Sequence, residues 1–312
     1  MPSSTRTPVV LCHAACTGGS MIYRLLVSTF GFCGISEISH GRRTAFGFSP
    51  VDPEAQLFSI GQIDHSGFGA ILAERLVNTR EMAAQSGQRL LVREHTHNYF
   101  FNADCPEVVP KGPSWVADQF GSQVPSIDTP VVVTVRDPID SWLGFRQNFN
   151  HLQPDRFEDY CAKYNQFFDR VESWQKRGKP IHVFKYEDCV VDAESAMRGV
   201  AQFLNVEFAG LDVSAAFKTV SSGNSGRQSA SLAIRKRRPF TMSLVKAARD
   251  SFEYSSLCTR LGYEPLHSNM TFSNRVSASF YSMLLPIRKI GNMVEAPGRW
   301  IYKQIRSGRG IQ

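Results

Sequence analysis

The stretch PVVLCHAACTGGSMIYRLL, residues 8–26, decides the fold of this chain. A short apolar run at 9–11 is broken by the polar turn TGGS at 17–20, and apolar residues then resume at helical spacing from Met21. This order predicts a strand, a tight turn and a helix. Such a turn directs several backbone N–H groups toward the positive end of a helix, which suits a phosphate or another tetrahedral anion.

Two interpretations of this turn stay open from the residues alone. The pair Gly18 and Gly19 is equally compatible with a turn that only leads the chain into its first helix. In the anion-binding interpretation, the glycines let the backbone approach a ligand and Ser20 adds a hydroxyl donor. The loop of nucleotide triphosphatases requires Gly-x-x-x-x-Gly-Lys-Ser/Thr, and this turn contains no lysine.

The length and the charge distribution limit the domain organisation. With 312 residues and 42% hydrophobic content, the chain can bury a large core, and we expect one α/β domain over residues 1–266. The net charge is +7, of which +6 falls on residues 266–312. We therefore expect a basic amphipathic tail at 267–312 and no nucleic-acid partner, because a nucleic-acid binder usually carries its basic residues on a folded face.

The cysteines and the apolar runs indicate a compartment. Seven cysteines form no Cys-x-x-Cys pair, which favours a reduced protein without structural zinc. No run of 18 apolar residues is present, and the N-terminus lacks the pattern of a secretory signal. These features predict a cytoplasmic protein, with a peripheral membrane contact through the tail as an option.

The remaining pattern alternates strands with helices. After the first strand, we expect strands at 31–39, 90–92, 130–135 and 181–186, and helices at 68–83, 157–174, 193–204 and 241–261. We expect Asp64, Asp155 and Asp192 to cap three of these helices, and residues 105–129 to form a long loop. The alternation predicts a three-layer α/β fold with a mostly parallel central sheet and helices on both faces.

Polar residues follow three of the expected strands directly. These groups are His13 onward, Arg93 to His97, and Arg136 to Ser141. Because ligands of parallel α/β sheets bind beyond the carboxyl ends of the strands, the three groups are expected to share one site.

Two of these segments resemble the sulfotransferases that use 3′-phosphoadenylyl sulfate (PAPS). HAACTGGS, residues 13–20, is similar to the carbohydrate-type phosphosulfate loop His-x-Pro-Lys-Thr-Gly-Gly-Ser/Thr, with Cys16 in place of the lysine. VVVTVRDPIDSWLGF, residues 131–145, is similar to the segment that binds the 3′-phosphate, and Arg136 matches its arginine. Ser141 takes one position that often holds serine, whereas the more usual serine position is Gly144. The alternative for Arg136 is a surface ion pair with its neighbour Asp137.

Three later segments extend the resemblance to residue 265. VFKYEDCVVDAESAMRGVAQFLNVEF (183–208) is similar to the Tyr-Glu-Asp segment and its helix, with Asn205 in place of a glycine. We interpret Tyr186, Glu187 and Asp188 as mainly structural residues that brace neighbouring loops. SSGNSGRQSASLAIRKRRP (221–239) is similar to the basic segment that folds over the donor, and SSLCTRLGYEP (255–265) to the closing helix.

The resemblance implies a P-loop-like fold, a sulfotransferase activity and a set of site residues. PAPS is the implied donor, the acceptor is a hydroxyl on a small molecule or glycan, and no metal is expected. His95 is the first candidate for the base, His97 the second, and Arg93 the accompanying basic residue. The alternative is that either histidine only bonds a backbone carbonyl. The implied donor-binding residues are Thr17, Gly18, Gly19, Ser20, Arg24, Arg136, Ser141, Arg227 and Arg235.

Two other function classes stay open. A P-loop kinase or NTPase would use Asp137 as a metal-binding carboxylate and require magnesium. A non-catalytic nucleotide-binding protein is favoured by Cys16 and Gly144, because the loop then lacks the lysine that would stabilise the leaving group unless Arg24 or Arg93 supplies the charge. For the tail at 267–312, a contact with an acidic membrane and packing on the domain or a second subunit are both open.

Overall fold

The computed structural model describes residues 7–38, 65–94, 129–148, 154–218, 232 and 237–266, with only the backbone for 65–73. Five strands form one sheet: β1 (Val9–His13), β2 (Cys33–Ile38), β3 (Leu90–Glu94), β4 (Val131–Val135) and β5 (Ile181–Lys185). Their order is β2-β3-β1-β4-β5, and every neighbouring pair is parallel. The predicted α/β fold with a parallel sheet is confirmed.

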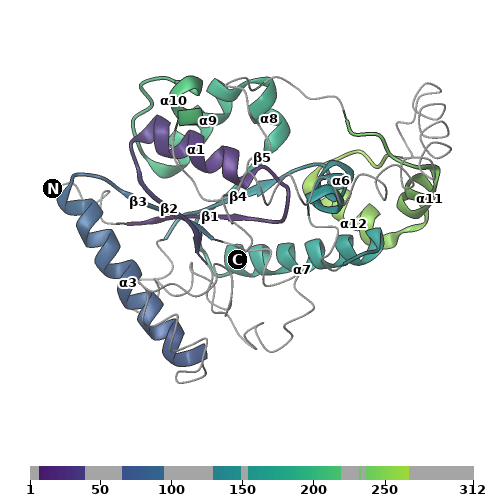
Figure 1. Ribbon diagram of the computed structural model, residues 1–312, viewed down its shortest axis with the longest axis horizontal. Helices are drawn as coiled ribbons and strands as arrows, with labels where there is room; N and C mark the ends of the chain where they lie inside the picture. Colours follow the sequence, from purple (N-terminus) through teal and green to yellow (C-terminus); the bar gives the residue numbers. More distant parts are fainter. Residues whose placement is uncertain are drawn as a thin grey trace, which may run out of the picture.

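Helices cover both faces of this sheet (Figure 1). One face carries α1 (Gly19–Phe30), α8 (Tyr186–Val191), α9 (Ala193–Leu204) and α10 (Val213–Lys218). The other carries α3 (His65–Gln85), α6 (Pro138–Asn148), α7 (Phe157–Lys176), α11 (Met242–Asp250) and α12 (Phe252–Leu261). The predicted three layers are therefore present.

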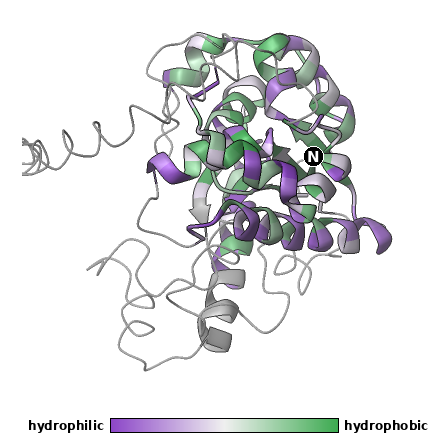
Figure 2. Ribbon diagram, turned by 90° about the vertical axis from the view of Figure 1, so that its right-hand side faces the viewer, coloured by the Kyte–Doolittle hydropathy of each residue, from purple (hydrophilic) through white to green (hydrophobic). Residues whose placement is uncertain are grey.

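The sheet separates two hydrophobic clusters. Along β1, Val9 and Leu11 pack on the α1 side, whereas Val10 and Cys12 pack on the α7 side. Every residue of β1, β3 and β4 is buried, as expected for apolar strands covered on both faces. Figure 2 shows hydrophobic and hydrophilic stretches alternating around the helices, which is typical of helices that cover a sheet with one side.

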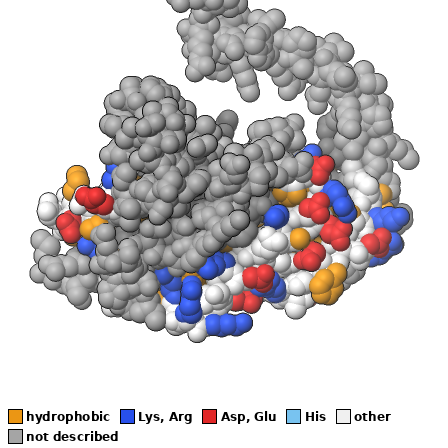
Figure 3. Space-filling model, turned by 90° about the horizontal axis from the view of Figure 1, so that it is seen from below, with side chains coloured by type: hydrophobic (Ala, Val, Ile, Leu, Met, Phe, Trp, Pro, Cys, Tyr) orange, Lys and Arg blue, Asp and Glu red, His pale blue; other side chains and the backbone are white. Residues whose placement is uncertain are grey.

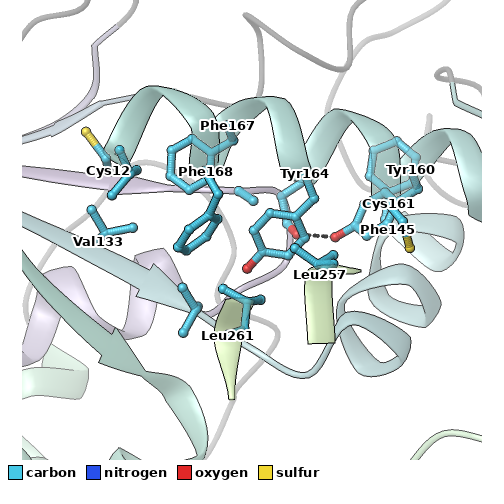
Figure 4. Packing of buried hydrophobic residues seen from close by; sticks show 14 of the residues in the cluster. Cys12, Val133, Phe145, Tyr160, Cys161, Tyr164, Phe167, Phe168, Leu257 and Leu261 are labelled. Carbon is cyan, nitrogen blue, oxygen red and sulfur yellow. Dashed lines mark hydrogen bonds between the residues drawn. The ribbon is translucent and has the colours of Figure 1, made fainter. Parts of the chain in front are cut away.

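The aromatic stripe of α7 forms the centre of the second cluster. Tyr160, Tyr164 and Phe167 are fully buried, and Figure 4 shows Tyr164 extending from α7 toward Leu257 of α12. The stripe therefore belongs to the core, as predicted. The predicted cap of this helix is wrong: the N-cap is Arg156 rather than Asp155, and it makes no side-chain cap bond. Acidic residues in the first turn, Glu158 and Asp159, complement the helix dipole instead.

The helix predicted at 241–261 is in fact two helices. Ser251 adopts an extended conformation (φ −91°, ψ 117°), ends α11 and caps α12 by accepting a hydrogen bond from the Tyr254 amide at 3.1 Å. Apolar residues continue at helical spacing across the break, and a serine favours a cap over a helix interior, so periodicity alone joined the two.

Other predicted helix ends are confirmed. The Asp192 carboxylate accepts from the Ser195 amide at 3.0 Å at the start of α9, and Asn205 ends that helix in the left-handed conformation (φ 50°). Gly262 ends α12 in the same way. Asp64, the loop at 105–128 and the tail at 267–312 lie outside the described residues.

The sheet order creates a switch point at β1. From β1 the chain passes to β2 and β3 on one side and then to β4 and β5 on the other. The carboxyl end of β1, between β3 and β4, is the expected ligand site of such a sheet. On the described surface seen from below, acidic and basic side chains are interspersed (Figure 3). No helix among the described residues has the length and apolarity needed to cross a membrane.

Candidate functional site

The loop between β1 and α1 is closely packed at its two glycines. Gly18 is the N-cap of α1 with a left-handed backbone (φ 91°), and its carbonyl accepts from the Met21 amide at 2.9 Å. A Cβ atom at Gly18 would lie 2.4 Å from the Tyr186 ring, and one at Gly19 would lie 2.5 Å from the His13 ring. Neither position has room for a larger residue, so the turn requires the glycine pair.

The same turn leads into α1, whose first backbone amides can donate hydrogen bonds to a ligand. The amides of Gly19 and Ser20 precede the first intrahelical hydrogen bond, and amides at this position have no acceptor within a helix. The first turn of α1 contains no acidic side chain that would compete for them. The geometry at the N-terminus of α1 is therefore suited to an anion.

Thr17 fixes the loop to the sheet. Its hydroxyl donates to the Ala14 carbonyl at 2.8 Å and lies 3.1 Å from the hydroxyl of Thr134 in β4, and the residue is fully buried. The Thr17 side chain therefore lies in the interior, where its hydrogen bonds stabilise the conformation of the loop.

Arg93 connects three elements at the end of β3. Its Nη1 lies 3.1 Å from the Ser20 hydroxyl and 3.2 Å from Nε2 of His13, and its Nε donates to the Ser36 hydroxyl at 2.7 Å. The side chain is 1% exposed, and burial lowers the pKa of Arg93 to about 10, which leaves it charged at neutral pH. Arg93 therefore orients Ser20 and His13 from inside the protein. The Tyr23 side chain acts to raise this pKa, and the charge of Arg24 on α1 acts to lower it.

Arg136, at the end of β4, lies beside the loop. Its Nη1 is 3.5 Å from the Cys16 carbonyl oxygen, and its guanidinium carbon is 4.5 Å from the centre of the Tyr186 ring. Its Nε is buried and has no hydrogen-bond partner within the part of the chain that the structure describes. The predicted ion pair between Arg136 and Asp137, the alternative interpretation, is not formed, because Arg237 pairs with that carboxylate.

Ser141 lies in the first turn of α6 and is fully buried. Its amide donates to the Asp137 carbonyl at 2.9 Å, and its hydroxyl faces the Tyr160 side chain, where burial raises the pKa of the phenol and the Ser141 hydroxyl acts to lower it. Ser141 stays a predicted ligand of the donor.

Cys16 occupies an unusual position within the loop. It is a non-glycine residue with positive φ (63°), and its Sγ lies 3.8 Å from the Asn148 amide nitrogen. Burial raises the pKa of the Cys16 thiol, although Asn148, Arg136 and Arg238 act to lower it. The thiol is therefore neutral near pH 7 and provides no charge.

Arg237 ties the segment after residue 236 to the start of α6. Its guanidinium lies 2.7 Å from the Asp137 carboxylate and 3.2 Å from that of Asp140. The other Asp137 oxygen accepts from the amides of Ile139 and Asp140 at 2.9 and 3.0 Å. Burial raises the pKa of Asp137, and the Arg237 charge opposes that shift. Both oxygens of Asp137 are thus engaged within the protein.

Glu187 braces two loops, as the sequence predicts for the Tyr-Glu-Asp segment. Its carboxylate accepts from the Asp137 amide at 3.0 Å and from the Tyr263 hydroxyl at 2.6 Å. Burial raises the pKa of Glu187, while the bond from Tyr263 acts to lower it. Its neighbour Tyr186 also contacts the candidate site directly, because the Arg136 guanidinium stacks on its ring.

Several predicted residues are not described. His95, His97, Arg227 and Arg235 all lie outside the described residues. The last described residue of β3, Glu94, is fully buried and accepts a hydrogen bond from the Cys12 thiol at 3.2 Å. Within the described ranges, no three metal-ligating side chains cluster.

Two contributors to this site take a more specific place in the structure than the sequence indicates. The sequence predicts a mainly structural role for Tyr186, whereas its ring also contacts the Arg136 guanidinium. The resemblance implies that the basic cluster Arg235, Lys236, Arg237 and Arg238 reaches the 3′-phosphate, with a solvated loop as the alternative, and nothing in the sequence separates Arg238 from its neighbours.

The comparison with protein families finds one match. Residues 117–235 match the model of the sulfotransferase domain. The matched range contains Arg136 and Ser141, whereas the loop at 13–20, Arg93 and Arg238 lie outside it. The resemblance to sulfotransferases is thereby confirmed, and a transferase is supported as the enzyme class. The carbohydrate-type form of the first loop is not confirmed by the match.

Similar solved structures are distant. The sulfotransferase domain of the olefin synthase from Synechococcus PCC 7002 is 14% identical, with a TM-score of 0.47, over 82% of this chain and 95% of that chain. The sulfotransferase domain from the curacin biosynthetic pathway is 14% identical, with a TM-score of 0.45, over 83% and 99%. Mouse sulfotransferase SULT7A1 complexed with PAP is 13% identical, with a TM-score of 0.39, over 81% and 89%. No curated protein sequence matches this chain significantly.

Proposed function

We propose that this protein transfers a sulfonate group from PAPS to an acceptor hydroxyl. The observation that carries the proposal is the 3.5 Å distance between Nη1 of Arg136 and the Cys16 carbonyl oxygen. By this distance, an arginine that directly follows β4 lies beside the turn that follows β1. PAPS carries a phosphosulfate at one end and a 3′-phosphate at the other, so neighbouring sites of this kind fit its two charged groups.

Each predicted donor-binding residue has a defined part in this proposal. The amides at the start of α1 and the Ser20 hydroxyl receive the phosphosulfate, and Thr17 keeps their loop in place. Arg136 and Ser141 receive the 3′-phosphate, and Arg24 adds positive charge at the end of the sheet. Arg227 and Arg235 are proposed to close over the nucleotide.

The chemistry requires a base for the acceptor hydroxyl. In the reaction, the acceptor oxygen bonds to sulfur while the bond between sulfur and the bridging phosphate oxygen breaks, and 3′,5′-ADP (PAP) leaves. We propose His95 as the base, with His97 as the second choice, since a histidine accepts a proton near neutral pH. His95 follows Glu94 directly in the chain, and His97 comes two residues later. Arg93 is proposed as a positioning residue, because its guanidinium contacts Ser20 and His13 and fixes their orientation.

The acceptor is proposed by class only. A hydroxyl on a small molecule or on a glycan fits a base at the end of β3, and the form of the first loop favours a glycan. The proposed setting is cytoplasmic, with PAPS as the donor and without a metal cofactor.

Two measurements test the function. Isothermal titration with PAP is expected to give one binding site per chain, and transfer of labelled sulfonate from PAPS is then screened over hydroxyl acceptors. If the protein binds no PAP, the donor assignment is wrong. If it binds PAP and transfers sulfonate to no acceptor, the non-catalytic alternative is correct, which the neutral Cys16 thiol in the loop favours.

A kinase or NTPase is disfavoured by the contacts of Asp137. Its carboxylate pairs with Arg237 at 2.7 Å and accepts two backbone amides of α6. A role as a magnesium ligand would require it to give up the ion pair. We therefore retain sulfonate transfer as the proposed reaction.

The tail at 267–312 has two proposed roles. Its basic and apolar residues suit an acidic membrane surface, and they equally suit packing on the domain or on a second subunit. Sedimentation with phosphatidylserine liposomes, with and without residues 267–312, separates the two roles. Loss of binding on truncation supports the membrane role, and equal binding of both forms removes it.

A further inference from the structure

Two departures from the sulfotransferase pattern meet in space. Cys16 stands where the loop pattern has a lysine, and Gly144 stands where a serine is more usual. A Cβ atom at Gly144 would lie 3.1 Å from Cβ of Cys16 and 3.5 Å from its Sγ. The two small residues are therefore neighbours, and together they leave room beside the loop.

An arginine side chain enters that room. Nη1 of Arg238 lies 3.2 Å from the position that a Cβ atom at Gly144 would take, so its guanidinium lies over Gly144 and beside Cys16. Any side chain at residue 144 would have to displace it. Arg136 lies at the same loop, 3.5 Å from the Cys16 carbonyl oxygen, so two guanidinium groups approach Cys16.

The preceding residue fixes the approach of Arg238. Arg237 is held by Asp137 at 2.7 Å and by Asp140 at 3.2 Å, both at the start of α6. Those ion pairs neutralise the charge of Arg237 and fix the position of the backbone next to Arg238. The position of Arg238 is thus set by the fold.

We propose that Arg238 supplies the positive charge that the loop lacks at Cys16 and contacts the phosphate oxygen from which the sulfonate departs. This inference rests on the sulfotransferase function proposed above. As the bond between sulfur and the bridging oxygen breaks, its electron pair stays on that oxygen, and negative charge grows on the phosphate of PAP. The acceptor oxygen forms the new bond to sulfur, and its proton passes to the base.

A guanidinium is suited to this task. It stays protonated at all relevant pH values and offers several N–H donors in one plane, which match phosphate oxygens. A fixed donor aimed at developing charge lowers the barrier of the chemical step itself. The loss of Arg238 is therefore expected to reduce kcat more than it reduces the affinity for PAP.

The test compares four variants in transfer from labelled PAPS to an acceptor found by the screen, with PAP affinity measured alongside. Arg238→Ala is expected to lower kcat by about 100-fold or more. Arg238→Gln, which keeps a polar side chain of similar length without its charge, is expected to show a comparable loss. The double variant that carries Cys16→Lys and Arg238→Ala should have a kcat at least tenfold higher than that of Arg238→Ala alone. Arg249→Ala, an exposed arginine of α11, is the matched control and should stay within twofold of the wild type.

The outcomes separate the two proposals. A wild-type protein that transfers no sulfonate refutes the sulfotransferase function, and the role of Arg238 with it. A wild-type protein that transfers sulfonate while Arg238→Ala and Arg238→Gln keep kcat within twofold refutes the role of Arg238 alone. So does a loss of kcat that the lysine at residue 16 does not recover. Thermal unfolding of each variant identifies any variant that fails to fold, and the glutamine variant then replaces the alanine one.

Discussion

At the scale of single residues, Tyr186 connects the two halves of the proposed donor site. Its ring lies so close to Gly18 that a Cβ atom there would overlap it, and the Arg136 guanidinium carbon lies 4.5 Å from the ring centre. A cation–π contact of this kind is worth about 0.5–2 kcal/mol, depending on solvent exposure. The ring thus orients Arg136 toward the loop before a ligand binds.

Replacing Arg136 by alanine is expected to abolish the measurable binding of PAP. Hydrogen bonds to charged groups contribute about 1.5–3 kcal/mol each, so losing two of them weakens binding by about 100-fold or more. Isothermal titration measures the effect. The control is Arg198→Ala, since Arg198 also stacks on a ring, that of Phe208 at 4.8 Å, but belongs to α9. Equal affinity of the Arg136 variant and the wild type would contradict the site.

Replacing Cys16 by alanine is expected to change kcat by less than about threefold. Burial raises the pKa of the thiol, so the wild-type side chain is neutral, and the contact that its Sγ makes with the Asn148 side-chain amide is long, at 3.8 Å. Steady-state transfer rates of Cys16→Ala and Cys16→Ser check this. A loss above tenfold in both variants would mean that the thiol itself takes part in binding or catalysis.

At the scale of secondary-structure elements, the site depends on how α1 and α6 begin. The N-terminus of α1 is shaped by the close approach of Gly18 to α8, and the N-terminus of α6 is capped by Asp137, which Arg237 holds from the other side. Both helices therefore start at positions fixed by distant parts of the chain.

The variant Gly18→Ala is expected to reduce both stability and donor binding. The residue has φ 91°, and the added methyl group would lie 2.4 Å from the Tyr186 ring, so the ring and Arg136 must move. Gly31→Ala is the matched control, because Gly31 also has positive φ (63°), but among the described residues no atom beyond its chain neighbours lies within 4 Å of the added Cβ. The control should lose about 1 kcal/mol of unfolding free energy and keep its PAP affinity. Equal PAP affinities of the two variants would disprove the packing argument.

The sequence predicts helices and strands correctly where the residues of one short segment decide them. The strand β4 and the cap of α9 follow from an apolar run and from one aspartate, and both are confirmed. The break at Ser251 was missed because apolar periodicity runs through it, and the cap at Arg156 was missed because a nearby aspartate is the stronger local signal.

Contacts that depend on tertiary packing were beyond the sequence. The four basic residues at 235–238 look alike in the chain, yet Arg237 forms ion pairs with α6 and Arg238 lies beside Cys16. The strand ends that bear His13, Arg93 and Arg136 were predictable as one site because a parallel sheet aligns them. The burial of Arg93 was not, since it depends on Ser36 of β2 and Ser20 of α1.

At the scale of the whole molecule, the sheet order makes β3, β1 and β4 neighbours, so their carboxyl ends lie side by side and the site is assembled from all three. Arg237 and Arg238, which come later in the chain than α10, lie at these same strand ends. The resulting arrangement gathers several arginines around one loop, which suits a donor with multiple negative charges.

Sulfonate transfer by this assembly is expected to be independent of magnesium. In the proposed mechanism arginines and backbone amides supply the positive charge, and Asp137 already forms an ion pair with Arg237. Rates with labelled PAPS are measured with EDTA present, and again after magnesium is added in excess over the chelator. Unchanged rates support the sulfotransferase proposal, whereas a loss that magnesium restores would favour a phosphotransferase-like mechanism.

The central place of β1 has a consequence for biosynthesis. This strand leaves the ribosome before both of its partners, because Val10 pairs with Val92 on one side and with Val131 on the other. A nascent chain that ends before β4 has an apolar strand with an unfilled edge, and pairings between remote segments form slowly. Translation must therefore pass residue 135 before the first strand is enclosed, and until then β1 is a natural target for a chaperone.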